Sequence, residues 1–220
     1  MGSKLNQGKI MELLDGLYEK SIQGVAKVSP SIDVLADNYL QKIPDKKRAA
    51  KSFINYQIAK CTTSGFITGL GGLITLPVAI PANVSSVMYV QMRMIACLAY
   101  MGGYGTNSDQ VQTLVYACLA GISIDQILKN VGIQFGTKFT VAMVKKIPGT
   151  ALNKINQKVG FRFLTKFGSK GLINIGKAVP IIGGVIGGGF DLVETEIIAN
   201  RAYKMFIEGN FEVLSNTDNE

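Results

Sequence analysis

Residues 64–103 read SGFITGLGGLITLPVAIPANVSSVMYVQMRMIACLAYMGG, and Arg93 is the only charged residue among them. The stretch is too apolar for a protein surface, and its glycines and prolines interrupt it too often for a simple membrane span. An arginine in such surroundings must find a partner, lie against a lipid headgroup or serve a site. We therefore expect an element of the core or of a membrane-associated surface.

Helical periodicity continues on both sides of this stretch. Apolar residues recur at spacings of three and four, and similar patterns predict helices over 5–28, 32–43, 45–61, 83–100, 125–146, 150–167 and 190–208. Asn83 is a candidate N-cap, and either Asn107 or Ser108 is the candidate cap of a further helix, whose apolar face runs from Val111 to Ile122. Alternating strand patterns are nearly absent. The sequence thus predicts an all-α fold, a single-domain helical bundle over 1–220 with two Gly/Pro-rich apolar helical hairpins at 64–82 and 171–189.

Charge divides the chain into three parts. Residues 1–45 carry a net charge of −1, residues 46–190 carry +14 with only two carboxylates, and residues 191–220 carry −5. A basic body between acidic ends indicates either an anionic partner or charge complementarity within the fold.

The residue inventory excludes several kinds of chemistry. The chain has no histidine, which excludes Ser-His-Asp and Cys-His catalysis and histidine metal sites. Its three cysteines (Cys61, Cys97 and Cys118) are typical of free, mostly buried thiols in a reducing cytosol. The glycine runs follow no predicted strand and match no nucleotide-binding motif, so they indicate close helix packing. We expect no metal, no cofactor and, without a cationic leader, no secretion.

A ridge of basic residues recurs every four positions along the helix predicted over 150–167. With two lysines before it, this ridge is the candidate lipid- or anion-binding site: Lys145, Lys146, Lys154, Lys158, Arg162, Lys166 and Lys170. Aliphatic and aromatic residues lie between these cations, a pattern that suits an anionic membrane surface. Nucleic acid is disfavoured because exposed stacking aromatics are lacking. A solvated face, or neutralisation by the acidic ends, explains the ridge equally well.

The second candidate set is a buried polar core: Asn83, Gln91, Arg93, Asp191 and Glu194. We expect Arg93 to be buried and paired with Asp191, with Glu194 or with carbonyls at a helix end. A structural role is favoured over a catalytic one. A weak internal repeat accompanies the set, because Arg93 and Arg201 each lie ten residues after a candidate cap, Asn83 and Asp191.

The chain resembles the EcsC family. The segments that carry the resemblance are residues 64–103, quoted above, DQVQTLVYACLAG (109–121), NQKVGFRFLTKFGSKGLINIGKAVPIIGGVIGGGFD (156–191) and TEIIANRAYKMF (195–206). Together they cover well over half of the chain, in the family's order. The resemblance implies a bacterial helical protein whose namesake is encoded beside an ABC exporter-like system. Many family members have aspartate at the position of Asn83, and the amide here weakens any acid–base role.

These observations favour a non-enzymatic, membrane-associated protein, cytoplasmic and peripheral on the inner face of the cell membrane. It would bind anionic lipid or a membrane protein partner through residues 138–177, as an accessory to an ABC transport system. The alternative is a hydrolase that acts on a lipid or peptide, although no catalytic motif is identifiable. The sequence leaves open the activity, the ligand, the oligomeric state and whether the 64–103 hairpin enters lipid or forms a soluble core.

Overall fold

The computed structural model describes residues 6–26, 28–61, 82–133, 138, 140–167 and 186–210, with backbone only at 60–61, 82–83, 167 and 186–193. Within these residues every regular element is helical, and one isolated bridge joins Val25 to Ser29. The prediction of an all-α fold is therefore confirmed. The hairpins predicted at 64–82 and 171–189 lie outside the described residues, apart from Ala82 and the backbone of 186–189.

The described helices follow one another along the chain, and the last of them continues into a π-helix, η1. Their bounds are α1 Gln7–Gln23, α2 Ile32–Lys42, α3 Lys46–Cys61, α5 Ala82–Met101, α6 Asp109–Ala120, α7 Asp125–Lys129, α8 Val141–Val144, α9 Gly149–Phe167, α11 Ile186–Ala202 and η1 Tyr203–Ile207.

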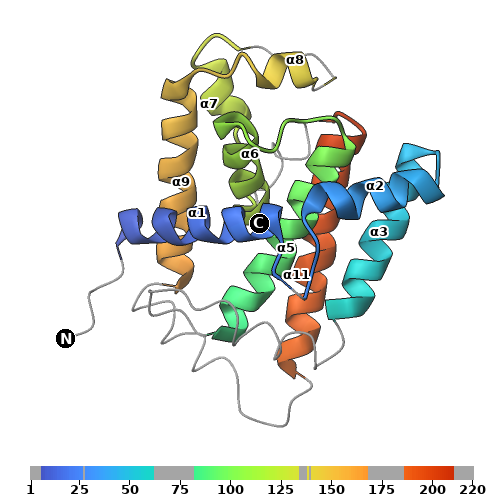
Figure 1. Ribbon diagram of the computed structural model, residues 1–220. Coiled ribbons are helices and arrows are strands. Elements are labelled where there is room, and N and C mark those ends of the chain that lie inside the picture. Colours follow the sequence, from blue (N-terminus) through green and yellow to red (C-terminus); the bar gives the residue numbers. More distant parts are fainter. Residues whose placement is uncertain are drawn as a thin grey trace.

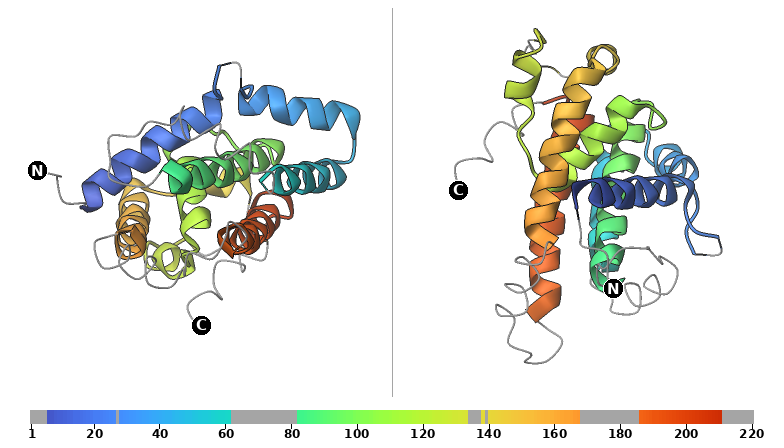
Figure 2. Two further views of the ribbon diagram at one scale, coloured as in Figure 1. Left: turned by 90° about the horizontal axis from the view of Figure 1, so that it is seen from below. Right: turned by 90° about the vertical axis from the view of Figure 1, so that its left-hand side faces the viewer.

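Helix α5 is the centre of the bundle. It packs against α1, α2, α3, α6, α11 and η1. In Figure 1, α9, α6, α5, α11 and α3 run roughly upright from left to right, and α1 crosses in front of α9 and α6. Viewed from below, α1 and α2 form an outer layer, while α9 and α11 lie on the opposite side of α5 (Figure 2).

Helix α5 is long and apolar, and it is buried inside the protein. Residues Val84–Met101 are long and apolar enough to cross a membrane, yet 83% of them are buried in the fold. Arg93 and Gln91 lie within this span and are themselves buried. This part of the 64–103 stretch is therefore a core helix, and residues 64–81 lie outside the described residues.

Several predicted boundaries differ from the structure. Helix α1 ends at Gln23, five residues early, because Gly24 adopts φ +80° and turns the chain toward α2. Ser108 caps α6 as expected, accepting a hydrogen bond from the amide of Val111. Asn83 is the second residue of α5, and Asp191 lies well inside α11, so neither is an N-cap.

The prediction of a single helix over 125–146 is wrong. Two short helices, α7 and α8, replace it. Gly132 has φ +77° in the turn that follows α7, a conformation that L side chains rarely adopt and that ends the helix there.

Buried phenols join α1 to α6 and to the loop between α5 and α6. The Tyr18 hydroxyl donates to the carbonyl of Thr106 (2.7 Å), and the Tyr116 hydroxyl donates to Asp15 (2.7 Å). The rings of Tyr18 and Tyr116 meet edge to face at 5.7 Å. Burial raises the pKa of both phenols, and it raises the pKa of Tyr104 to about 12.

The raised pKa values of these phenols predict that the fold loses stability at alkaline pH. Unfolded tyrosines ionise near pH 10 whereas Tyr18, Tyr104 and Tyr116 stay protonated in the fold, so unfolding releases protons above that pH. The contribution of these three phenols to the free energy of unfolding is complete below about pH 10. Above that pH it falls by up to about 4 kcal/mol per pH unit. In an absorbance titration at 295 nm, at least three of the eight tyrosines should ionise only as circular dichroism is lost. Titration of all eight near pH 10 with a native spectrum would contradict this.

Candidate functional site

Helix α9 has one buried face and one exposed face. Ala151, Ile155, Val159 and Phe163 recur every four residues and are buried. The same helix packs against α6 and against α1, which crosses it (Figure 1). Its other face therefore points away from the bundle and is available to a ligand.

Two parallel rows of side chains cover this outer face. One is the basic row Lys154–Lys158–Arg162, and the other is the row Gln157–Phe161–Thr165. All six residues are exposed, and each row follows the four-residue spacing of a helix surface. Phe161 has 64% of its surface in solvent, the largest fraction among the exposed large apolar residues of the described chain.

A groove of about 580 Å³ lies between these rows and the α6–α7 turn. Its lining residues are Ile122, Ser123, Ile127, Lys154, Gln157, Lys158, Phe161, Arg162 and Thr165. Ile122 and Ile127 are only 8% and 7% exposed, so they form an apolar floor beneath the polar rim. The groove contains three cations and no carboxylate, so it is chemically suited to an anionic amphiphile.

The carboxylate closest in sequence to the groove is Asp125, and it is occupied by other partners. Asp125 accepts hydrogen bonds from the Ser123 hydroxyl and from Lys129, whose ammonium lies 3.4 Å from the carboxylate. Within the described residues Lys154, Lys158 and Arg162 form no ion pair. Their charges therefore face solvent at the groove.

The predicted basic ridge is not uniform. Lys166 pairs with Glu194 of α11 at 2.5 Å, so among the described residues the acidic C-terminal part neutralises the ridge at this position. Lys145 and Lys146 are exposed just after α8 and do not line the groove. Lys170 lies outside the described residues. The structure thus assembles only the middle of the ridge into a shaped site.

A second hollow, of about 340 Å³, lies on the other side of Arg162. Leu119 and Ala120 of α6 line it with Arg162, Thr165, Lys166 and neighbouring residues of α9, and with Glu194. The Lys166–Glu194 pair lies at this hollow. Arg162 and Thr165 border both spaces.

The buried polar set is only partly as expected. Gln91 is buried and donates to the Thr195 hydroxyl at 3.0 Å. Glu194 is not a core residue, because 44% of its side chain is exposed where it meets Lys166. The side chains of Asn83 and Asp191 lie outside the described residues.

Arg93 is 5% exposed, and its guanidinium bonds to carbonyls. One nitrogen donates to the carbonyl of Ser21 in the last turn of α1 at 2.8 Å, and the other donates to the carbonyl of Pro30. Of the partners expected, the helix-end carbonyls are those found. The negative end of the α1 dipole there favours a cation.

Arg201, which the weak internal repeat relates to Arg93, repeats this arrangement, although no partner was predicted for it. It is 8% exposed and donates to the carbonyl of Cys118, in the last turn of α6, at 3.0 Å. Gly121 ends α6 with φ +64°, and a Cβ there would lie 3.0 Å from the Arg201 guanidinium. The two arginines are structural, since each closes the C-terminal end of a neighbouring helix.

The described thiols are free and buried, as expected. Cys97 and Cys118 have no exposed surface, and burial raises the pKa of each to about 12. In the described part of the chain no three histidine, cysteine or carboxylate side chains gather as metal ligands.

Comparisons with protein-family models, curated proteins and solved structures find no match. The resemblance to the EcsC family, and the ABC transport system that it implies, therefore stay predictions.

Proposed function

We propose that the outer face of α9 attaches the protein to anionic membrane surfaces. The observation that carries this proposal is Phe161, a largely exposed aromatic residue beside Lys154, Lys158 and Arg162. Cations that surround an exposed apolar side chain are the features by which peripheral helices bind the boundary between headgroups and acyl chains. The anionic cytoplasmic leaflet is the proposed location.

The expected binding energy supports reversible association. Each basic residue near an anionic surface contributes about 1 kcal/mol, so the three cations supply about 3 kcal/mol, which salt reduces. Insertion of Phe161 adds about 1–2 kcal/mol of apolar burial. The sum is well below that of a membrane-spanning helix, and high salt is expected to release the protein.

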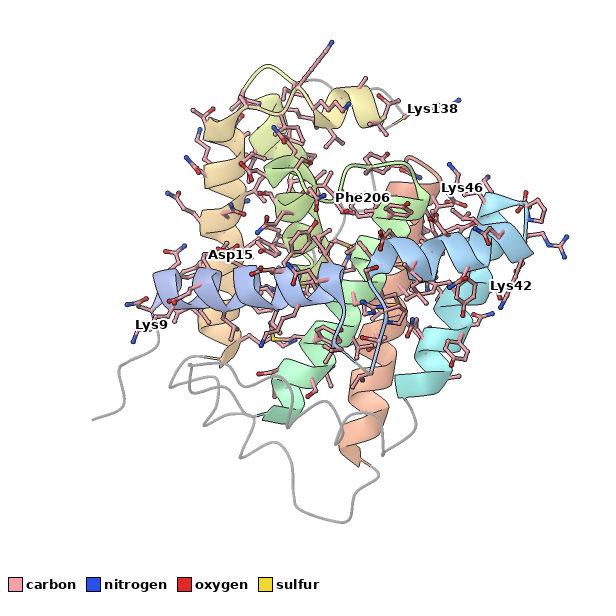
Figure 3. The ribbon with its side chains drawn as sticks, in the orientation of Figure 1. Lys9, Asp15, Lys42, Lys46, Lys138 and Phe206 are labelled. Carbon is pink, nitrogen blue, oxygen red and sulfur yellow. The ribbon has the colours of Figure 1, made fainter. Side chains whose placement is uncertain are left out.

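Neutralising the basic row tests the charge component. Replacing Lys154, Lys158 and Arg162 together with glutamine should weaken co-sedimentation with vesicles rich in phosphatidylglycerol about 100-fold. Binding to phosphatidylcholine vesicles should not change. The matched control replaces Lys46, Lys47 and Arg48, which are exposed near the corner between α2 and α3, far from α9 (Figure 3). This control removes the same charge and should weaken binding to the anionic vesicles less than threefold.

Equal losses for the two triple variants would mean that only net charge matters. That result would contradict a site on α9. Absence of wild-type binding to anionic vesicles at low salt would overturn the proposed function itself.

Phe161→Trp tests insertion directly. The chain contains no tryptophan, so this variant carries a single fluorophore. Its emission should shift to the blue with anionic vesicles and stay unchanged with neutral ones, because the ring leaves water only when the face docks. Tyr56→Trp, at a position on α3 that is 55% exposed, is the control and should not shift. An unshifted spectrum of bound Phe161→Trp protein would rule out insertion at this residue.

A further inference from the structure

The groove beside α9 has a more defined shape than adsorption to a membrane surface requires. Adsorption requires only cations and an exposed apolar side chain, whereas this surface is hollowed to about 580 Å³. That volume lies inside the range of about 300–1,000 Å³ typical of small-molecule sites. The hollow therefore has room for part of a single ligand molecule.

The lining separates two kinds of chemistry. Lys154, Lys158 and Arg162 supply positive charge along about 12 Å of α9, at 1.5 Å per residue. Ile122 and Ile127, which are nearly buried, form the apolar floor on the opposite side of the groove. An arginine and two lysines suit phosphate oxygens, and branched aliphatic side chains suit hydrocarbon.

We propose that this groove binds one anionic phospholipid molecule. The phosphate lies against Lys154, Lys158 and Arg162, and the first carbons of an acyl chain lie on Ile122, Ile127 and Phe161. This inference rests on the proposed function, because the same face must first meet the membrane. It adds that the protein selects a lipid by headgroup charge and chain together, and that it binds that lipid one to one.

Short-chain lipids separate this inference from adsorption, because they bind as monomers without a membrane. In calorimetric titrations below the critical micelle concentration, dihexanoyl phosphatidylglycerol should bind the full chain saturably at one site. Dihexanoyl phosphatidylcholine, which lacks net charge, should bind at least tenfold more weakly. Glycerol 3-phosphate and inorganic phosphate, which lack the chains, should also bind at least tenfold more weakly.

A variant that fills the groove gives the second test. Gln157→Trp places a large ring in the middle of the groove and keeps all three cations. It should reduce binding of dihexanoyl phosphatidylglycerol at least tenfold and change binding to anionic vesicles less than threefold. The control is Asn153→Trp, which is exposed on α9 outside the groove and should behave as wild type in both assays.

The outcomes distinguish the two proposals. If vesicles bind but the short-chain lipid does not, or if Gln157→Trp and Asn153→Trp bind it equally, the groove site is overturned and the membrane proposal stands. If phosphatidylcholine or inorganic phosphate binds as well as phosphatidylglycerol, selection by charge and chain together is overturned. If the short-chain lipid binds but anionic vesicles do not, the membrane proposal fails.

Discussion

Replacing Arg93 with methionine is expected to lower the free energy of unfolding by about 3–5 kcal/mol. The guanidinium donates to the carbonyls of Ser21 and Pro30, which join the end of α1 to the turn before α2. A hydrogen bond to a charged group contributes about 1.5–3 kcal/mol, and methionine leaves both acceptors without this donor. Because whole domains are stable by about 5–15 kcal/mol, the loss should be plain in urea or guanidinium unfolding.

Two control variants test whether the loss of stability comes from the hydrogen bonds of Arg93. Arg93→Lys keeps the charge but lacks the planar fork that reaches both carbonyls, so an intermediate loss is expected. Arg162→Met, on the exposed face of α9, should change stability by less than about 0.5 kcal/mol. An Arg93→Met protein as stable as wild type would mean that the two carbonyls do not depend on Arg93.

Gly24→Ala is expected to lower the free energy of unfolding by about 2–6 kcal/mol, through the same turn. Gly24 has φ +80° and ψ −172°, a conformation essentially confined to glycine that costs an L side chain about 1–3 kcal/mol. An added Cβ would also lie 2.4 Å from the carbonyl oxygens of both Ser29 and Pro30, and these backbone atoms cannot rotate away. Displacing them adds about 1–3 kcal/mol and disturbs the acceptor that Arg93 binds.

Gly103 offers a matched comparison. It has φ +89°, but no atom lies within 4 Å of a Cβ built there. Gly103→Ala should therefore show the backbone cost alone, about 1–2 kcal/mol, in the same thermal or denaturant unfolding experiment. Equal losses at Gly24 and Gly103 would show that the carbonyls yield to the added methyl group.

Spacing within one helix was predictable, and contact between distant segments was not. The four-residue recurrence of Lys154, Lys158 and Arg162 predicted a common face, because helix geometry relates such positions directly. Ile122 lies in the α6–α7 turn and Ile127 lies in α7, and nothing in their local pattern indicates that they meet α9. An exposed Phe161 among cations was a stronger signal than the ridge itself, and sequence reasoning treated it as one apolar residue among several.

The burial of Arg93 was predictable from its uncharged surroundings, but its acceptors were not. Carboxylates can be read from a sequence, whereas every residue has a backbone carbonyl, so Ser21 and Pro30 carry no distinguishing mark. Glu194 was expected in the core, and it pairs with Lys166 on the surface instead. The prediction of one helix over 125–146 failed because the apolar spacing was given more weight than Gly132, which ends α7.

The two buried arginines also bear on the order of folding. Arg93 bonds to a carbonyl 72 positions earlier, and Arg201 bonds to one 83 positions earlier. Contacts this distant along the chain form only after long loops have closed. The end of α1 therefore acquires its donor only when α5 docks, and the end of α6 acquires its donor only when α11 docks. Each arginine thus makes the end of one helix depend on a helix far along the chain, so detachment of α5 is expected to loosen α1, and detachment of α11 is expected to loosen α6.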